Sequence, residues 1–128
     1  MTDNTQPTAS HNFSKLEEAV VNAIQDRKGI NITIIDFSKL ESAPSRSFII
    51  CEGKSTSQVS AIADNIRESV REKTGTKPYN YDGYRNSQWI VIDYGDLIVH
   101  VFVPEFREFY NLEDLWSDAD LIELPNLD

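Results

Sequence analysis

Residues 89–102 read WIVIDYGDLIVHVF and contain two strong strand patterns, from which the sheet can be predicted. Two runs rich in β-branched residues, Gln88–Tyr94 and Leu97–Val103, flank the dipeptide Gly95-Asp96. Two strand-like runs around a two-residue loop that begins with glycine are typical of a β-hairpin with a type II′ turn. Pro104 ends the second run. The sequence therefore predicts an antiparallel hairpin here.

The short loop also predicts which hairpin residues lie opposite each other, from Tyr94 and Leu97 at the turn to Trp89 and Phe102 at the far end. Directly opposed residues share a face of the sheet. One face is almost wholly aliphatic and holds Ile90, Ile92, Tyr94, Leu97, Val99 and Val101. The other is mixed and holds Trp89, Val91, Asp93, Ile98, His100 and Phe102.

The two faces predict different surroundings. The aliphatic face is expected to pack against the long helices. For the mixed face two alternatives stay open. In one, the segment Glu105–Trp116 folds back and covers it, with Asp93 and His100 as an internal hydrogen-bonded pair. In the other, the cover is partial and leaves Trp89 and its neighbours to a partner.

The remaining elements follow from capping and periodicity. Ser14 and Glu17 form a capping box ahead of an amphipathic stripe that ends at Lys28-Gly29. The other expected elements are a strand at Ile30–Phe37, a short strand at Phe48–Cys51, a helix from Ser55 to Gly75, one short strand within Lys77–Asn86, and short helical turns in Glu105–Trp116.

This order predicts an α/β domain with a single mixed β-sheet of four to five strands flanked by helices. Residues 1–13 are polar and without periodicity, and are expected to be disordered. The domain then spans residues 14–118. Residues 119–128 are expected to be an acidic tail in which the chain frays.

The chain has 128 residues, one cysteine and a net charge of −9, which suits one domain in a reducing compartment. With neither a bilayer-length apolar run nor a signal peptide, it is expected to be cytoplasmic, with no membrane partner. Residues 104–128 hold eight acids and one base, so the acidity is a C-terminal feature. It disfavours direct specific nucleic-acid recognition and favours a basic protein partner, or serves only as a solubilising tail.

The sequence patterns that would indicate a catalytic site are incomplete in this chain. Gly53-Lys54-Ser55 resembles the end of a phosphate-binding loop, but Phe48 stands where that loop needs its first glycine. Cys51 lies inside an apolar strand and is expected to be a core residue. Two histidines without a cysteine cluster make a poor metal site. The sequence therefore predicts a binding protein without catalytic residues, metal or cofactor.

Several segments together resemble the ribosomal silencing factor family (RsfS, also called Iojap). The resemblance covers about residues 14–118. It rests on the Asp-Tyr-Gly-Asp turn with its following Val-His strand and on three further segments, Phe48–Gly53, Gln58–Asp64 and Arg107–Trp116.

The resemblance implies a nucleotidyltransferase-like α/β fold that lacks the catalytic acids of working nucleotidyltransferases. It implies binding to ribosomal protein number fourteen of the large ribosomal subunit, which blocks association with the small subunit and represses translation. The contact surface that it carries over consists of Trp89, Asp93, Tyr94, Asp96, His100, Arg107, Tyr110, Leu112 and Leu115.

One position departs from the family pattern, because Arg46 stands where the family usually has an acidic residue. Three other functions stay open at this point. They are a role in large-subunit biogenesis, a degenerate nucleotidyltransferase-like enzyme, and a homodimeric adaptor that pairs through the sheet edge or the hairpin face.

Overall fold

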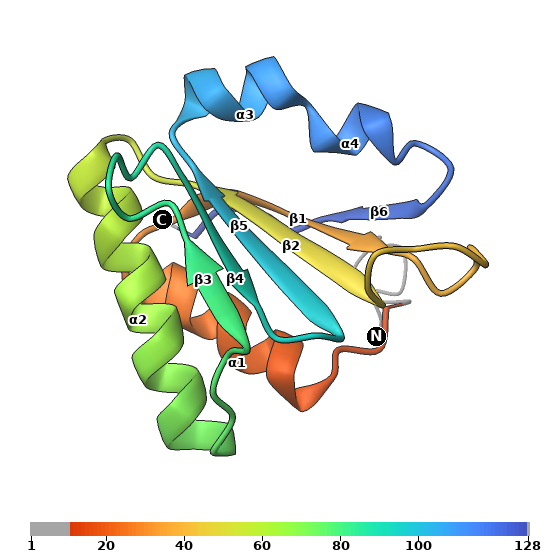
Figure 1. The fold of residues 1–128 in the computed structure, drawn as a ribbon, viewed down its shortest axis with the longest axis horizontal. Coiled ribbons are helices and arrows are strands. Elements are labelled where there is room, and N and C mark those ends of the chain that lie inside the picture. The colour runs from red at the N-terminus through yellow and green to blue at the C-terminus, as the bar shows by residue number, and fades with distance from the viewer. Residues whose placement is uncertain (1–10, 128) are drawn as a thin grey trace.

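The computed structural model describes residues 11–127, which form a single mixed six-stranded sheet with helices on both faces (Figure 1). The strand order across the sheet is β3-β4-β5-β2-β1-β6. The elements in chain order are α1 (Lys15–Asp26), β1 (Ile30–Asp36), β2 (Ser47–Glu52), α2 (Thr56–Thr74), β3 (Asn80–Asp82), β4 (Trp89–Asp93), β5 (Leu97–Phe102), α3 (Pro104–Tyr110), α4 (Leu112–Leu115) and β6 (Asp120–Glu123).

The predicted hairpin is confirmed in its register. Trp89 pairs with Phe102 and Asp93 with Ile98, as the two-residue loop requires. Gly95 has a φ of +87°, the left-handed conformation that makes glycine necessary at this turn. The hairpin joins the rest of the sheet through a parallel pairing of β5 with β2, whereas the other pairings are antiparallel.

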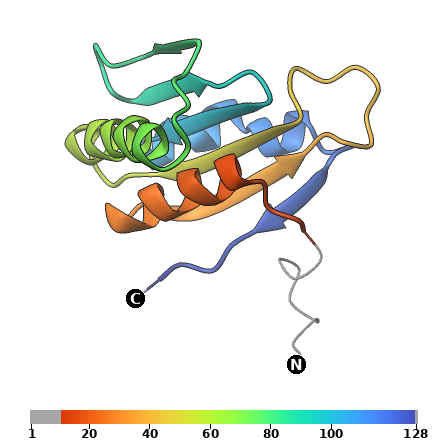
Figure 2. The same ribbon diagram turned by 90° about the horizontal axis from the view of Figure 1, so that it is seen from below.

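The two long helices cover one face of the sheet, and the predicted aliphatic face of the hairpin packs against them (Figure 2). The capping box of Ser14 and Glu17 is present at the start of α1. Gly75, at a φ of +74°, ends α2 in the left-handed conformation that favours glycine. Among residues 11–127 no helix has the length and apolar composition needed to cross a bilayer.

The opposite face carries the segment α3–α4, which lies above the sheet along the top of Figure 1. A second, smaller core lies beneath it. Phe37, Phe48 and Phe102 are buried there, and Leu112 and Trp116 pack onto them from α4 and its C-terminal end. The mixed face of the hairpin is therefore an inner surface over part of its area.

The sheet has six strands, not the four to five expected from the sequence. The prediction that the chain frays after residue 118 is wrong for β6, which pairs with β1 and buries Ile122. β6 is only four residues long and has one buried side chain, too short a pattern to stand out in the sequence. With the predicted short strand, β3, at one edge and β6 at the other, the hairpin lies inside the sheet.

The predicted disordered segment falls mostly outside the described residues, which begin at His11. His11 and Phe13 themselves are placed against the domain, in disagreement with the prediction. The imidazole Nε2 of His11 lies 3.3 Å from a carboxylate oxygen of Glu17, and its ring meets that of Phe13 edge-on.

Candidate protein-binding surface

The segment α3–α4 forms because two residues set its bends. Pro104 occupies the first turn of α3, where a missing N–H costs nothing and a fixed φ favours helix. Asn111, at a φ of +45°, separates α3 from α4, and asparagine tolerates this left-handed conformation better than most residues do. The chain therefore makes two short helices that follow the sheet instead of one that leaves it.

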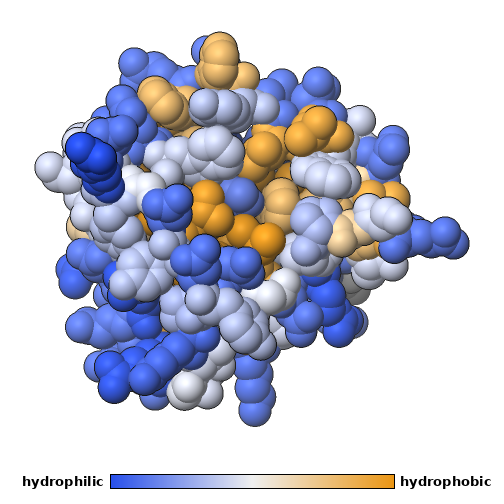
Figure 3. Space-filling model, viewed as in Figure 1, coloured by the Kyte–Doolittle hydropathy of each residue, from blue (hydrophilic) through white to orange (hydrophobic). Residues whose placement is uncertain are grey.

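Large apolar side chains point outward from this segment. Phe109 is 80% exposed, Leu115 is 68% exposed and Tyr110 is 44% exposed. Between the segment and the open part of the sheet, Val91 and Ile98 are half-buried. Figure 3, in the same view as Figure 1, shows apolar residues along the top of the molecule and in the middle of this face. Contiguous exposed apolar surface of this kind marks interaction sites.

Trp89 joins the exposed segment to the sheet beneath it. Its ring centroid lies 5.0 Å from that of Phe102 in a stacked arrangement and 4.6 Å from that of Tyr110. Its indole Nε1 donates a hydrogen bond of 3.1 Å to Nδ1 of His100. The side chain of Tyr110 is thereby held on a rigid aromatic base.

His100 lies within the smaller core and does not pair with Asp93. Its ring is 4.5 Å from that of Phe48, and burial lowers its pKa to about 4, so it is neutral at pH 7. Asp93 instead accepts a hydrogen bond of 2.7 Å from the backbone N–H of Gly95. The expected Asp93–His100 pair is thus absent. Because Trp89 and Ile98 are half-buried, the partial cover is the alternative that the structure supports.

Arg107 fastens α3 to the sheet, and all five of its N–H groups are used. They donate to Glu113 and Glu52, to Thr33 Oγ1 and to the backbone oxygen of Asn31. The guanidinium reaches Glu113 Oε2 at 2.6 Å and Glu52 Oε2 at 3.1 Å, and its side chain is 11% exposed. Its planar fork allows this many simultaneous contacts, which a lysine does not.

Acidic side chains surround the exposed apolar ones. Glu105 and Glu108 on α3 are exposed, as are Asp114 on α4 and Asp118 beyond it. An apolar centre with an acidic rim is complementary to a partner surface that is apolar at its centre and basic around it.

Groups for covalent or metal chemistry are not gathered at this surface. Burial raises the pKa of the Cys51 thiol to about 12, which keeps it protonated at pH 7 and inert as a nucleophile. Within residues 11–127 no three His, Cys, Asp or Glu side chains are grouped so that they could hold a metal ion.

A family model described as "Ribosomal silencing factor during starvation" matches residues 10–128. The chain belongs to the ribosomal silencing factor family. A relative named ribosomal silencing factor RsfS, from Halalkalibacterium halodurans, is 37% identical over 113 residues, which are 88% of this chain and 95% of the relative. The chloroplast protein Iojap of Zea mays is 42% identical over 80 residues, 62% of this chain and 34% of that protein.

The fold is also that of solved relatives. A crystal structure of a protein from Chromobacterium violaceum matches with a TM-score of 0.77 and 30% identity, over 84% of this chain and 88% of that one. The family match extends through β6 and so includes residues that the sequence had suggested to be a tail.

The nine residues carried over from the family resemblance fall into four groups in the structure. Tyr110, Leu112 and Leu115 lie on the segment α3–α4, and Trp89 contacts it through Tyr110. His100 and Arg107 support it from below, and Asp93 and Asp96 belong to the turn at the far end of the hairpin. Tyr94 lies on the opposite face, 5% exposed within the core under the long helices.

Phe109 was missed by sequence reasoning, although it is the most exposed aromatic residue of the segment. It stands directly before Tyr110, and its ring meets that of Tyr110 edge-on with centroids 5.0 Å apart. The pattern of α3 is too weakly amphipathic to show which of its aromatic residues face solvent.

Proposed function

We propose that the chain is a ribosomal silencing factor. It binds the large ribosomal subunit through ribosomal protein number fourteen and blocks association with the small subunit, which represses translation. Membership of the family supports this function, as do the relatives that carry the name ribosomal silencing factor. The expected nucleotidyltransferase-like character of the fold stays a prediction.

The observation that carries the proposal is the exposed apolar segment α3–α4 with its acidic rim. Phe109, Tyr110 and Leu115 offer the large side chains that dominate binding energy at protein interfaces. Trp89 and Arg107 hold the segment in place, so little conformational entropy is lost when a partner binds. Ribosomal proteins are basic because they contact RNA, and the acidic rim suits such a partner.

Blocking of subunit joining needs only that this protein occupies the joining surface. The mechanism is steric and uses contact without bond making or breaking. The protonated Cys51 thiol and the Gly53–Ser55 turn, which has no paired acids after it, are consistent with action by binding.

Sedimentation tests the proposal directly. The protein is expected to migrate with large subunits in a sucrose gradient and to be absent from intact ribosomes. Tyr110→Ala and Leu115→Ala are each expected to weaken binding to purified large subunits by about 2 kcal/mol, roughly thirtyfold. Leu121→Ala is the control, because Leu121 is also exposed but belongs to β6 and not to the segment. Parent-like binding by both variants would place the interface elsewhere.

A second measurement separates binding from blocking. Purified subunits are mixed at a magnesium concentration that favours joining, and joining is followed by light scattering. The protein is expected to suppress the rise in scattering, and Tyr110→Ala is expected to restore it. Binding without suppression would disprove the anti-association mechanism while leaving the partner assignment intact.

A further inference from the structure

A groove of about 770 Å³ lies between α2 and β3, on the side of the sheet opposite to α3–α4. Its charged walls include Arg67, Arg71 and Lys77 together with Asp64, Glu68 and Glu72. Tyr81 forms part of the wall on β3, where it pairs with Ile92, a residue of the helix-side core. The groove is therefore separated by the whole sheet from the surface proposed to bind the ribosomal protein.

Two exposed tyrosines lie at this groove, Tyr81 in its wall and Tyr79 beside it. Tyr79 is 84% exposed and Tyr81 is 45% exposed. The Arg67 guanidinium lies 3.6 Å from the centre of the Tyr81 ring, a cation–π contact that orients the ring. The Tyr79 ring rests on the hairpin turn, where a Cβ on Gly95 would come within 2.8 Å of its Cε2. Both rings offer aromatic surface to solvent.

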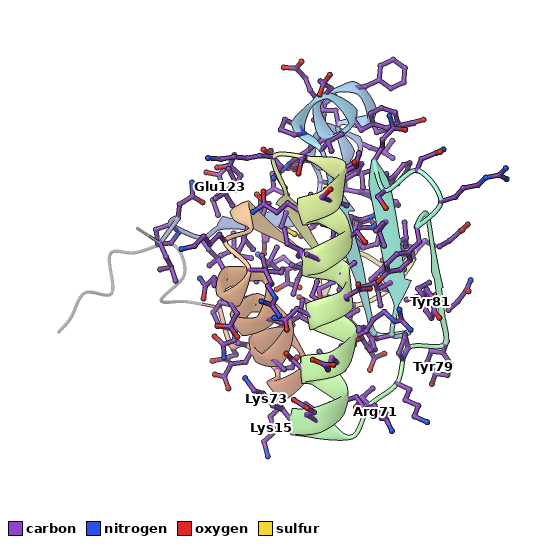
Figure 4. The ribbon with its side chains drawn as sticks, turned by 90° about the vertical axis from the view of Figure 1, so that its left-hand side faces the viewer. Lys15, Arg71, Lys73, Tyr79, Tyr81 and Glu123 are labelled. Carbon is purple, nitrogen blue, oxygen red and sulfur yellow. The ribbon has the colours of Figure 1, made fainter. Side chains whose placement is uncertain are left out.

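Five of the twelve bases of the chain lie in the stretch that forms α2, β3 and the loops beside them. Residues 67–85 hold five bases and three acids, although the whole chain has a net charge of −9. Within residues 11–127, Arg71, Lys73, Lys77 and Arg85 form no ion pair. Figure 4 shows Lys15, Arg71 and Lys73 gathered at one end of the helical layer, with Tyr79 and Tyr81 beside them at the sheet edge.

We propose that the α2–β3 groove binds single-stranded nucleic acid without sequence preference. Unpaired bases stack on Tyr79 and Tyr81, and the phosphates lie near Arg71 and Lys77. Exposed aromatic rings interleaved with basic side chains are the features by which proteins hold single strands, because every base presents a planar face. An acidic polypeptide would match the bases of the groove but would leave the rings without a stacking partner.

The net acidity of the chain does not oppose this site, because the charges are separated in space. The exposed acids of α3–α4 lie at one end of the molecule and the basic end of α2 lies at the other (Figure 4). At physiological ionic strength, charges more than about 8 Å apart in solvent are largely screened from one another. The walls of the groove hold three bases and three acids, so the charge there is balanced and the net acidity of the chain does not extend to the groove.

The test is fluorescence anisotropy of a labelled 12-nucleotide single-stranded RNA of mixed sequence with the full-length protein. Saturable binding is expected at low salt, and binding is expected to be weaker for a duplex of the same length. Arg71→Gln with Lys77→Gln is expected to lower the slope of log affinity against log salt by about 1.4, because each phosphate contact to a single strand contributes about 0.7.

The stacking contacts are tested by Tyr79→Ala, which is expected to weaken RNA binding about fivefold or more, and by Tyr79→Trp, which is expected to retain it. Phe109→Ala is the matched control, because Phe109 is as exposed as Tyr79 but lies on α3. The proposal is overturned if the RNA does not bind, if Tyr79→Ala binds like the parent, or if a polyglutamate peptide competes as well as unlabelled RNA.

Discussion

His100 shows at the scale of one residue how burial changes what a histidine can do. Nδ1 accepts the hydrogen bond from Trp89, so the proton of the neutral ring sits on Nε2. That atom is buried and has no partner among residues 11–127. A second proton would add a charge to a core of aromatic rings, which is why burial lowers the pKa to about 4.

The lowered pKa predicts that His100 destabilises the fold in acid. Between pH 6.5 and about 4 the unfolded chain binds a proton at this residue and the folded chain does not. Stability that is present above pH 6.5 is therefore lost as the pH falls, by about 3 kcal/mol at pH 4. Urea unfolding across this range should show the loss. His100→Asn keeps an acceptor for Trp89 and should have a shallower pH dependence; an unchanged slope would contradict this account.

Tyr94 and Trp89 show what strand alternation can and cannot predict. Alternation placed Tyr94 on the aliphatic face, and the structure confirms that it is buried there, with its pKa raised to about 12 by burial. Alternation also placed Trp89 on the mixed face. It could not say how much of that face α3–α4 would leave open, because this depends on contacts such as Trp89 with Tyr110, which are 21 positions apart in the sequence.

At the scale of elements, the placement of α3–α4 depends on Arg107. Neither helix has a fully buried residue, so burial alone holds the segment weakly. The guanidinium joins α3 to α4 through Glu113 and to the sheet through Glu52 and Thr33. A charge network that is mostly out of water is far more sensitive to the loss of one member than an exposed ion pair is.

Removal of this arginine is expected to loosen the segment before the rest of the fold. Arg107→Gln leaves Glu52 and Glu113 without their cation and should lower the free energy of unfolding by about 3 kcal/mol. Hydrogen exchange should show the amides of α3 and α4 losing protection while those of α2 keep it. Arg85→Gln, at an exposed arginine, should change stability by less than about 0.5 kcal/mol. Unaltered exchange in α3 and α4 would mean that other contacts hold the segment.

The elements that could be predicted are those with a long, strong pattern. The hairpin and both long helices had repeated periodicity and clear capping or turn residues, and all three are confirmed. β6 has four residues and one inward side chain, so nothing in its own sequence distinguishes it from a polar tail. It forms because the exposed edge of β1 offers hydrogen bonds and an apolar contact, and that edge exists only in the folded protein.

At the scale of the whole molecule, the sheet separates two surfaces of unlike chemistry. The exposed side of α3–α4 is apolar with an acidic rim, whereas the α2–β3 side carries tyrosines among bases and acids. A net charge of −9 describes neither of them. Summed charge is a guide to solubility and long-range attraction, and the fold decides which local surface a partner meets.

The sixth strand completes the sheet, and the stability of the whole domain should depend on it. Ile122 is 8% exposed within the main core, while its neighbour Leu121 is 42% exposed on the same strand. Ile122→Ala should therefore lower the free energy of unfolding by about 2 kcal/mol through lost burial and the cavity left behind. Leu121→Ala, which removes a side chain of equal size from the solvent side, should cost less than about 1 kcal/mol. Urea unfolding of both variants measures the difference. Equal small effects would show that residues 119–128 behave in solution as the tail that the sequence suggested.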